Sequence, residues 1–360
     1  MRSTMKLAIL LLSLLLGSQA SYAEQLLLKK VIPNAESQQA VCMDGSPAVF
    51  YIFQQEKQKN WLIMLGGGVP CDTLKHCERT LESKINMTSS KARWKYIKGK
   101  GLLSSNQNHN PTFANWNKVF IPQCSMDVWV GKQKASAKTH GLAFQGGSIV
   151  HATIQALKDL GLKQAGNLLM LGNSAGGIGV MNHIDWITSQ LPNTKVKGLT
   201  DGSWILDTQP FPSRNTIHYD IQTRFSTLSM SIDDDCAKAY PNDTWRCIMG
   251  EHVYPHIQAP IFTRISQTDP VHLKRLGIPR HPSAEQNTYI QKHATDICQS
   301  LVPVNNFFSL QDTPHTVIKN NRVFSLAYQG QSFYDAITQF MQTPKDDIKI
   351  TDCSFTKSTQ

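Results

Sequence analysis

The stretch NLLMLGNSAGG, residues 167–177, joins a short apolar run to a helical pattern through the motif Gly-x-Ser-x-Gly. The helical pattern carries its apolar residues on one face, at Ile178, Met181, Ile184, Ile187 and Leu191. A strand, a sharp turn and a helix in this order are typical of a nucleophile elbow, which exposes a serine above the edge of a sheet. We therefore expect Ser174 to be a nucleophile at a helix N-terminus, where the helix dipole favours a developing negative charge.

Further apolar runs flank this stretch and alternate with helical patterns. The expected strands are 48–53, 61–65, 118–122, 168–171, 196–199, 260–265 and 306–310, and the expected additional helices are 147–160 and 334–341. The first two strands are separated by a few polar residues and predict a hairpin. The alternation as a whole predicts an α/β-hydrolase-like fold, in which helices cover both faces of a mostly parallel sheet.

Residues from about 208 to 257 interrupt this alternation. They contain two cysteines and an acidic run, and we expect a mostly helical insertion that forms a lid or a pocket wall. The apolar residues that could line such a wall are Phe211, Phe225, Leu228 and Met230.

The first residues have the pattern of a secretory signal peptide. Arg2 and Lys6 precede an apolar run over residues 7–16, and a small-x-small site ends at Ala23. The run is too short to span a membrane, and no later stretch is apolar enough to do so. We expect cleavage after Ala23, with Ala20 as the rival site, and one monomeric domain over 24–360 that is secreted or periplasmic.

Eight cysteines in an exported chain predict disulfides. The sequence-local pairs Cys71–Cys77 and Cys236–Cys247 are expected. The partners among Cys42, Cys124, Cys298 and Cys353 stay open. No C-x-x-C pair occurs and the histidines are scattered, so no metal site is expected.

The formal net charge of the chain is +10, and two of these charges lie in the expected signal peptide. Basic residues gather at Lys91, Arg93, Lys95, Lys98 and Lys100, around Trp94 and Tyr96, and again at Lys132, Lys134 and Lys138. Either cluster is an ordinary solvated face or a surface for an anionic polymer such as a polysaccharide. Nucleic acid is not expected as a partner, because no motif for binding it is present.

A serine nucleophile needs a histidine base and a carboxylate that orients the base. In the α/β-hydrolase chain order, the acid and then the histidine follow the serine, in loops at the carboxyl ends of strands. Asp269 follows the expected strand 260–265, and His315 follows 306–310. His272, His281 and His293 also follow Asp269, and His272 is the nearest rival, although no apolar strand leads directly into it.

Hydrolysis of an ester also needs N–H donors for the oxyanion. One donor is expected at Ala175, directly after the nucleophile. The others are expected in the glycine-rich loop after strand 61–65, at Gly68 and Val69, because Pro70 has no N–H.

The chain resembles the pectin acetylesterase family, and within it the Notum carboxylesterase branch. The resemblance extends to about residue 320 and rests on CMDGSPA (42–48), LGGG (65–68) with Cys71 and Cys77, GLLSS (101–105), NP (110–111), NWN (115–117), VFIPQCSMDVWVG (119–131), GNSAGG (172–177) and DGSW (201–204). It implies an α/β-hydrolase fold and carboxylesterase activity without a cofactor. Carried over by motif, it implies a triad of Ser174, Asp269 and His315, and oxyanion donors at Gly68, Val69 and Ala175.

One position departs from the family pattern. Members place a tryptophan after the glycines, where this chain has Val69, so a large side chain that helps to wall the pocket is missing. This affects the identity of the substrate more than the type of reaction.

The composition and the leader fit a bacterial exported protein as well as an animal or plant one, and a bacterium has no obvious acylated signalling protein as a substrate. The favoured hypothesis is therefore an exported serine esterase that deacetylates a polysaccharide such as pectin. The alternatives are an esterase for longer acyl chains on a lipid or protein, and a non-catalytic binding protein on a hydrolase scaffold. The last alternative predicts that Asp269 or His315 lies out of hydrogen-bond reach.

Overall fold

The computed structural model describes residues 25–71, 73–212, 225, 228–343 and 347–354. The expected signal peptide lies outside these ranges. The strands are β1 (Leu26–Val31), β2 (Val49–Phe53), β3 (Asn60–Leu65), β4 (Tyr96–Lys98), β5 (Asn117–Ile121), β6 (Asn167–Asn173), β7 (Lys195–Asp201), β8 (Ile261–Ser266), β9 (Phe307–Leu310), β10 (Ala327–Tyr328), β11 (Gln331–Ser332) and β12 (Lys349–Thr351). The α-helices are α2 (Leu74–Ser83), α3 (Ile85–Thr88), α4 (Gly146–Asp159), α5 (Ala175–Gln190), α7 (Asp234–Ala239), α8 (Gly250–Val253), α9 (Pro270–Arg275), α10 (Ala284–Ser300), α11 (Arg322–Ser325) and α12 (Phe333–Gln342).

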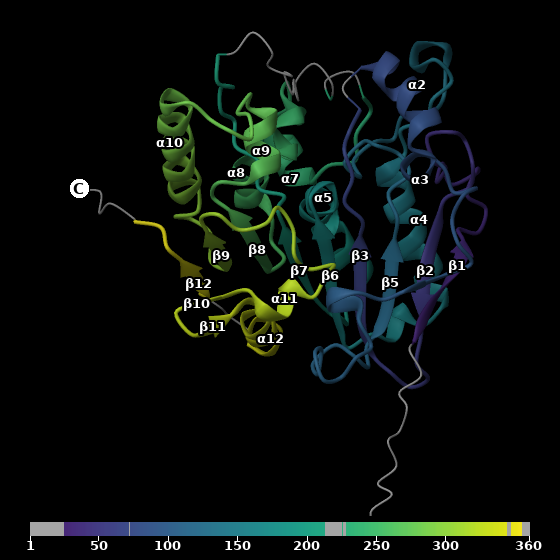
Figure 1. Ribbon diagram of the computed structural model, residues 1–360. Coiled ribbons are helices and arrows are strands. Elements are labelled where there is room, and N and C mark those ends of the chain that lie inside the picture. Colours follow the sequence, from purple (N-terminus) through teal and green to yellow (C-terminus); the bar gives the residue numbers. More distant parts are fainter. Residues whose placement is uncertain (1–24, 72, 213–224, 226–227, 344–346, 355–360) are drawn as a thin grey trace, which may run out of the picture.

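Ten strands form one sheet, in the order β12-β9-β8-β7-β6-β3-β5-β2-β1-β4 (Figure 1). Every neighbouring pair from β12 to β5 is parallel. The pairs that involve β2, β1 and β4 are antiparallel. The sheet is therefore mostly parallel, as the sequence predicts, and the carboxyl ends of β3, β6, β8 and β9 meet at one edge.

The central strands are buried on both faces, which explains their continuous apolar sequences. In β3, Trp61, Ile63 and Leu65 belong to a core that includes α4 and α5. Leu62 and Met64 point to the opposite face and belong to a second core with α12. Helices thus cover both faces of the sheet, and Figure 1 shows α12 apart from α4 and α5.

The expected hairpin of 48–53 with 61–65 is wrong. β5 lies between β2 and β3 in the sheet, paired antiparallel to β2 and parallel to β3. β3, which leads into the glycine-rich loop, is parallel to both of its neighbours and belongs to the buried centre of the sheet. β2 starts the antiparallel part.

Four disulfides tie the described chain together. Cys71–Cys77 and Cys236–Cys247 confirm the two expected local pairs. Cys42–Cys124 and Cys298–Cys353 complete the set. The last bond holds the segment after β12 to α10, and Cys236–Cys247 links α7 to a 3₁₀ turn in the expected insertion.

The expected insertion is helical where the structure describes it after residue 227, with α7, α8 and two 3₁₀ turns. Residues 213–224 and 226–227 lie outside the described ranges. Within the described part of the chain, no helix has the length and apolar character needed to cross a bilayer.

Candidate active site

Ser174 sits in the turn between β6 and α5, with a backbone φ of +53°. A positive φ is unfavourable for a residue with a side chain, and such strain gathers at functional sites. The turn is possible because two glycines let the backbone approach closely. A Cβ on Gly172 would lie 2.2 Å from the Gly176 carbonyl oxygen, and a Cβ on Gly176 would lie 2.1 Å from that of Leu65. The Gly-x-Ser-x-Gly motif thus has a steric cause at both glycines.

Asp269 follows β8 and caps the N-terminus of α9. Its Oδ1 accepts hydrogen bonds from the backbone N–H groups of Val271 (2.8 Å) and His272 (3.3 Å), which leaves Oδ2 for another partner. Burial by itself disfavours the carboxylate. The nearby His272 and the hydrogen bond from His315 nevertheless hold the pKa of Asp269 well below its usual range. The side chain is therefore an anion of fixed orientation.

His315 lies in the loop after β9 and connects the other two residues. Its Nδ1 is 2.6 Å from Asp269 Oδ2, and its Nε2 is 2.9 Å from Ser174 Oγ. With the Nδ1 proton donated to Asp269, Nε2 is the nitrogen that can accept the serine proton. The structure thus brings Ser174, Asp269 and His315 into one hydrogen-bonded chain.

The three rival histidines lie elsewhere or face another way. The ring of His272 is edge-on to that of His315, with centroids 5.5 Å apart, but the nitrogen that accepts the hydrogen bond of Ser174 belongs to His315. Burial lowers the pKa of His272 to about 4, so this imidazole is uncharged near neutral pH. His281 is exposed, and His293 is buried on α10.

The glycine-rich loop after β3 approaches the same turn. The Gly66 N–H donates to the Ile121 carbonyl, and the Gly67 N–H donates to Asn173 Oδ1 at 3.1 Å. Gly68 and Val69 are the next N–H groups along the loop. A Cβ on Gly68 would displace the side-chain amide of Gln123.

The described cavity beside Ser174 has a volume of about 10 Å³, and its wall includes Gly68 and Ala175. Val69 does not belong to this wall, and its side chain is 44% exposed. The remaining lining residues are Pro70, Val128, Ile178, Gly202, Ser203, Ile205, His272 and Arg275.

None of the four apolar residues expected to wall the pocket lines this cavity. Phe225 is fully buried in the core, and Phe211 packs against Tyr289. Leu228 and Met230 line a different pocket.

Neither basic cluster contributes a residue to the lining of this cavity. Lys91 pairs with Asp44, with Nζ and Oδ2 3.3 Å apart. Arg93 donates to the Gln123 carbonyl, and Lys132 borders the pocket that Leu228 and Met230 line.

Sequence reasoning missed a buried ion pair beneath the histidine loop. Arg264 of β8 and Asp201 of β7 are both fully buried, with Nη1 and Oδ1 3.1 Å apart. The same Arg264 nitrogen donates to the His315 carbonyl at 2.9 Å. Asp201 Oδ2 accepts from the N–H groups of Val317 (2.6 Å) and Ile318 (2.9 Å). Arg264 Nη2 also donates to Thr313 Oγ1 at 2.5 Å, so the pair anchors the loop on both sides of His315. Its sequence signals are an arginine inside the buried strand β8 and an aspartate at the end of β7.

Trp129 is a second residue that sequence reasoning missed. Its indole Nε1–H donates to the Gly66 carbonyl at 2.9 Å, at the start of the glycine-rich loop, and the side chain is fully buried. Met126, Val128 and Trp129 all have a positive φ, so this segment is strained. Trp129 thus positions the backbone that leads to Gly68.

We expect Trp129→Phe to lower kcat for an ester about 10-fold with little change in KM. The variant keeps an aromatic ring, although a smaller one, but leaves the buried Gly66 carbonyl without its donor, which costs about 1–3 kcal/mol and frees the loop to move. Steady-state kinetics beside Trp245→Phe checks this, because Trp245 loses a comparable bond to Asp243 inside the insertion. Equal kcat values for the two variants would contradict a positioning role.

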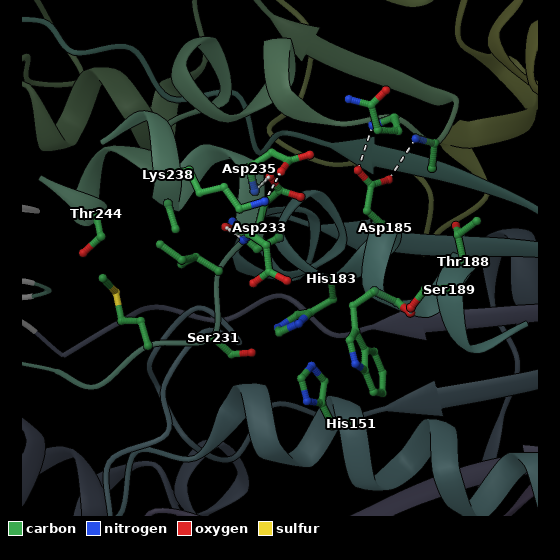
Figure 2. Close-up of a pocket in the computed structure, with 18 of the residues that line it drawn as sticks. His151, His183, Asp185, Thr188, Ser189, Ser231, Asp233, Asp235, Lys238 and Thr244 are labelled. Atoms are coloured by element: carbon green, nitrogen blue, oxygen red, sulfur yellow. Dashed lines mark hydrogen bonds and ion pairs between the residues drawn. The ribbon is translucent and has the colours of Figure 1, made fainter. Parts of the chain in front are cut away.

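A second, larger pocket of about 1000 Å³ lies along α5, α7 and residues 228–235 (Figure 2). His151 stacks on Trp186 with ring centroids 3.7 Å apart, and His183 stands edge-on to His151. His183 Nε2 lies 2.7 Å from the Trp129 carbonyl oxygen, so it donates its proton there. This pocket contains none of the predicted site residues.

Burial lowers the pKa of His183 to about 4 and that of His151 to about 3. As the pH falls, the unfolded chain therefore binds protons at these two histidines before the folded chain does. Their contribution to the free energy of unfolding is fully present above about pH 6.5 and decreases as the pH drops toward 4.

We expect His183 to lower the free energy of unfolding by about 2 kcal/mol when the pH falls from 7 to 4.5. Urea unfolding at both pH values should show a smaller decrease in this free energy for His183→Gln than for the wild type. The exposed His140 supplies the matched control, His140→Gln, which should lose as much as the wild type. An identical pH dependence for His183→Gln and the wild type would show that His183 does not contribute.

The fold and the geometry together define a class. A mostly parallel sheet, a serine in a strained turn between a strand and a helix, and a carboxylate and a histidine from loops after two further strands are the features of an α/β-hydrolase-like protein.

Comparison with known proteins places the chain more narrowly. The model of the family described as Pectinacetylesterase matches residues 21–358, so the chain belongs to the pectinacetylesterase family. Palmitoleoyl-protein carboxylesterase notum1a of Danio rerio is 32% identical over 320 residues, which cover 84% of this chain and 63% of that protein. The human palmitoleoyl-protein carboxylesterase NOTUM is 30% identical over 314 residues, which cover 82% of this chain and 63% of that protein. The chain thus spans slightly less than two thirds of the length of these relatives.

A solved structure of the Wnt deacylase Notum from Drosophila has the same fold. Its TM-score is 0.80 at 24% sequence identity, and the match covers 91% of this chain and 98% of that one.

Proposed function

We propose that this protein is an exported serine carboxylesterase in which Ser174, His315 and Asp269 form the catalytic triad. The observation that carries the proposal is the continuous chain of hydrogen bonds from Asp269 through His315 to Ser174, at 2.6 and 2.9 Å. A non-catalytic scaffold gives no reason for this alignment or for the strained φ of Ser174. Membership of the pectinacetylesterase family supports the same reaction class.

In the proposed mechanism, Ser174 Oγ attacks the ester carbonyl carbon while His315 Nε2 takes its proton. Asp269 holds the Nδ1 proton and stabilises the imidazolium that forms. The negative charge that develops on the carbonyl oxygen is bound by the N–H groups of Gly68, Val69 and Ala175. His315 then gives its proton to the departing alcohol. Water, activated in turn by His315, releases the carboxylic acid and restores Ser174.

We propose an acetylated polysaccharide such as pectin as the substrate. The described cavity beside Ser174 is small, which favours a short acyl group over a long one. Without Arg2 and Lys6 of the leader, the net charge of +10 becomes +8, which favours an anionic polymer over a neutral one.

Export, with cleavage after Ala23 and a single monomeric domain over 24–360, is part of the proposal. Four disulfides fit an oxidising compartment.

A series of p-nitrophenyl esters from acetate to palmitate tests the substrate class, followed by acetate release from acetylated pectin. We expect kcat/KM to be highest for acetate and to fall with chain length, and we expect acetate to be released from pectin. A maximum of kcat/KM at long acyl chains would indicate a lipid or an acylated protein as the substrate instead of a polysaccharide. No hydrolysis of any ester would overturn the esterase itself.

A further inference from the structure

Three potential metal ligands converge beside the nucleophile. Asp269, His272 and His315 each offer a ligand atom, and these atoms all lie within 4.8 Å of one another. Asp269 and His272 belong to the start of α9, whereas His315 comes from the loop after β9. Of the three, His272 also lines the cavity that contains Ser174.

The donor set indicates which ion fits. Two imidazoles and one carboxylate suit Zn²⁺, whereas Mg²⁺ and Ca²⁺ prefer a shell of oxygen atoms. Zinc binds such ligands at roughly 2.0–2.2 Å, which places the donors of a tetrahedral site roughly 3.4 Å apart. Asp269 Oδ2 and His315 Nδ1 are 2.6 Å apart in the structure, so zinc binding requires these side chains to rotate, and water supplies the fourth ligand.

We propose that Asp269, His272 and His315 form an inhibitory Zn²⁺ site. An imidazole nitrogen that is bound to a metal ion cannot donate or accept a proton. Zinc therefore takes from His315 either its hydrogen bond to Asp269 or its hydrogen bond to Ser174, and each loss removes the activation of the serine. The sequence gives no sign of this site, because its residues are not spaced as a zinc motif. Inhibition rests on the proposed esterase function, whereas zinc binding does not.

Calorimetry separates binding from inhibition. We expect Zn²⁺ to bind the full chain carrying Ser174→Ala with 1:1 stoichiometry and micromolar affinity, because this variant keeps all three ligands. Adding His272→Phe should weaken binding at least 10-fold. The matched control adds His140→Phe instead, which removes an exposed histidine that pairs with Glu78, and it should leave the affinity unchanged. His272→Gln repeats the test with a polar side chain if the phenylalanine variant does not fold.

Ester hydrolysis supplies the second readout. Zinc should inhibit the wild type, EDTA should restore the rate, and Mg²⁺ at the same concentration should have no effect. His272→Phe, compared with its own zinc-free rate, should need at least 10-fold more zinc for half inhibition.

Equal zinc affinity with and without His272, or an affinity that depends on His140, would overturn the site. Zinc binding at His272 without inhibition would overturn its inhibitory role. If no ester is hydrolysed at all, the proposed function fails while the calorimetry still tests the site.

Discussion

Replacing Ser174 with alanine is expected to lower kcat/KM for any ester substrate by about 10⁴-fold or more. The variant removes the atom that forms the acyl-enzyme, and only binding and the oxyanion donors would then contribute to the rate. The side chain itself makes a hydrogen bond to His315 and caps no helix, so folding should be preserved. Rates on p-nitrophenyl acetate, together with thermal unfolding of both proteins, measure the two effects separately.

Ser203→Ala is the matched control for this result. Ser203 also lines the cavity, and its Oγ donates to the Ser174 carbonyl at 2.8 Å, but it is not aligned with His315. We expect Ser203→Ala to lower kcat/KM by less than about 10-fold, which is the effect of losing one neutral hydrogen bond. A Ser174→Ala variant that retained a tenth of the wild-type rate would rule out Ser174 as the nucleophile.

Breaking the buried pair of Asp201 and Arg264 is expected to lower the free energy of unfolding by about 3–5 kcal/mol. Arg264→Met leaves the Asp201 carboxylate buried without its cation, and burial already raises the pKa of this carboxyl group. The same variant frees the His315 carbonyl, so kcat should fall as well. Urea unfolding and kinetics at low temperature measure both losses.

A double-mutant cycle shows whether the loss belongs to the pair. Asp201→Asn combined with Arg264→Met removes both charges, so the double variant should be more stable than the sum of the two single losses predicts. The exposed pair of Lys292 and Asp296 gives the reference, and Lys292→Met should cost less than about 0.5 kcal/mol. Strict additivity of the Asp201 and Arg264 losses would contradict the anchoring role.

Sequence patterns located most of the candidate site because its residues follow strands. An elbow turn forces glycines at fixed spacing around Ser174, and buried parallel strands leave apolar runs that point to Asp269 and His315. These signals are local. The spatial convergence of the three side chains follows from the parallel order of β6, β8 and β9, which such patterns also predict.

Features that depend on contacts between distant parts of the chain were not predicted from sequence patterns. The partners of β2 are β1 and β5, and β5 lies more than sixty residues later, so nearness in the chain suggested the wrong hairpin. Helix α10 is largely exposed and polar, and its sequence lacks the apolar spacing that marks α5. The pairing of Asp201 with Arg264, and the contact of Trp129 with Gly66, depend on packing between elements that are distant in the sequence.

Covalent labelling tests the central proposal most directly. Diethyl p-nitrophenyl phosphate transfers its phosphoryl group to an activated serine and releases p-nitrophenolate, so the reaction reports nucleophilicity without assuming a natural substrate. We expect one p-nitrophenolate per chain and a diethylphosphoryl group on the peptide that contains Ser174, with no reaction in Ser174→Ala. A protein that stays unlabelled, or that carries the label on another residue, would contradict the assignment of Ser174 as the nucleophile.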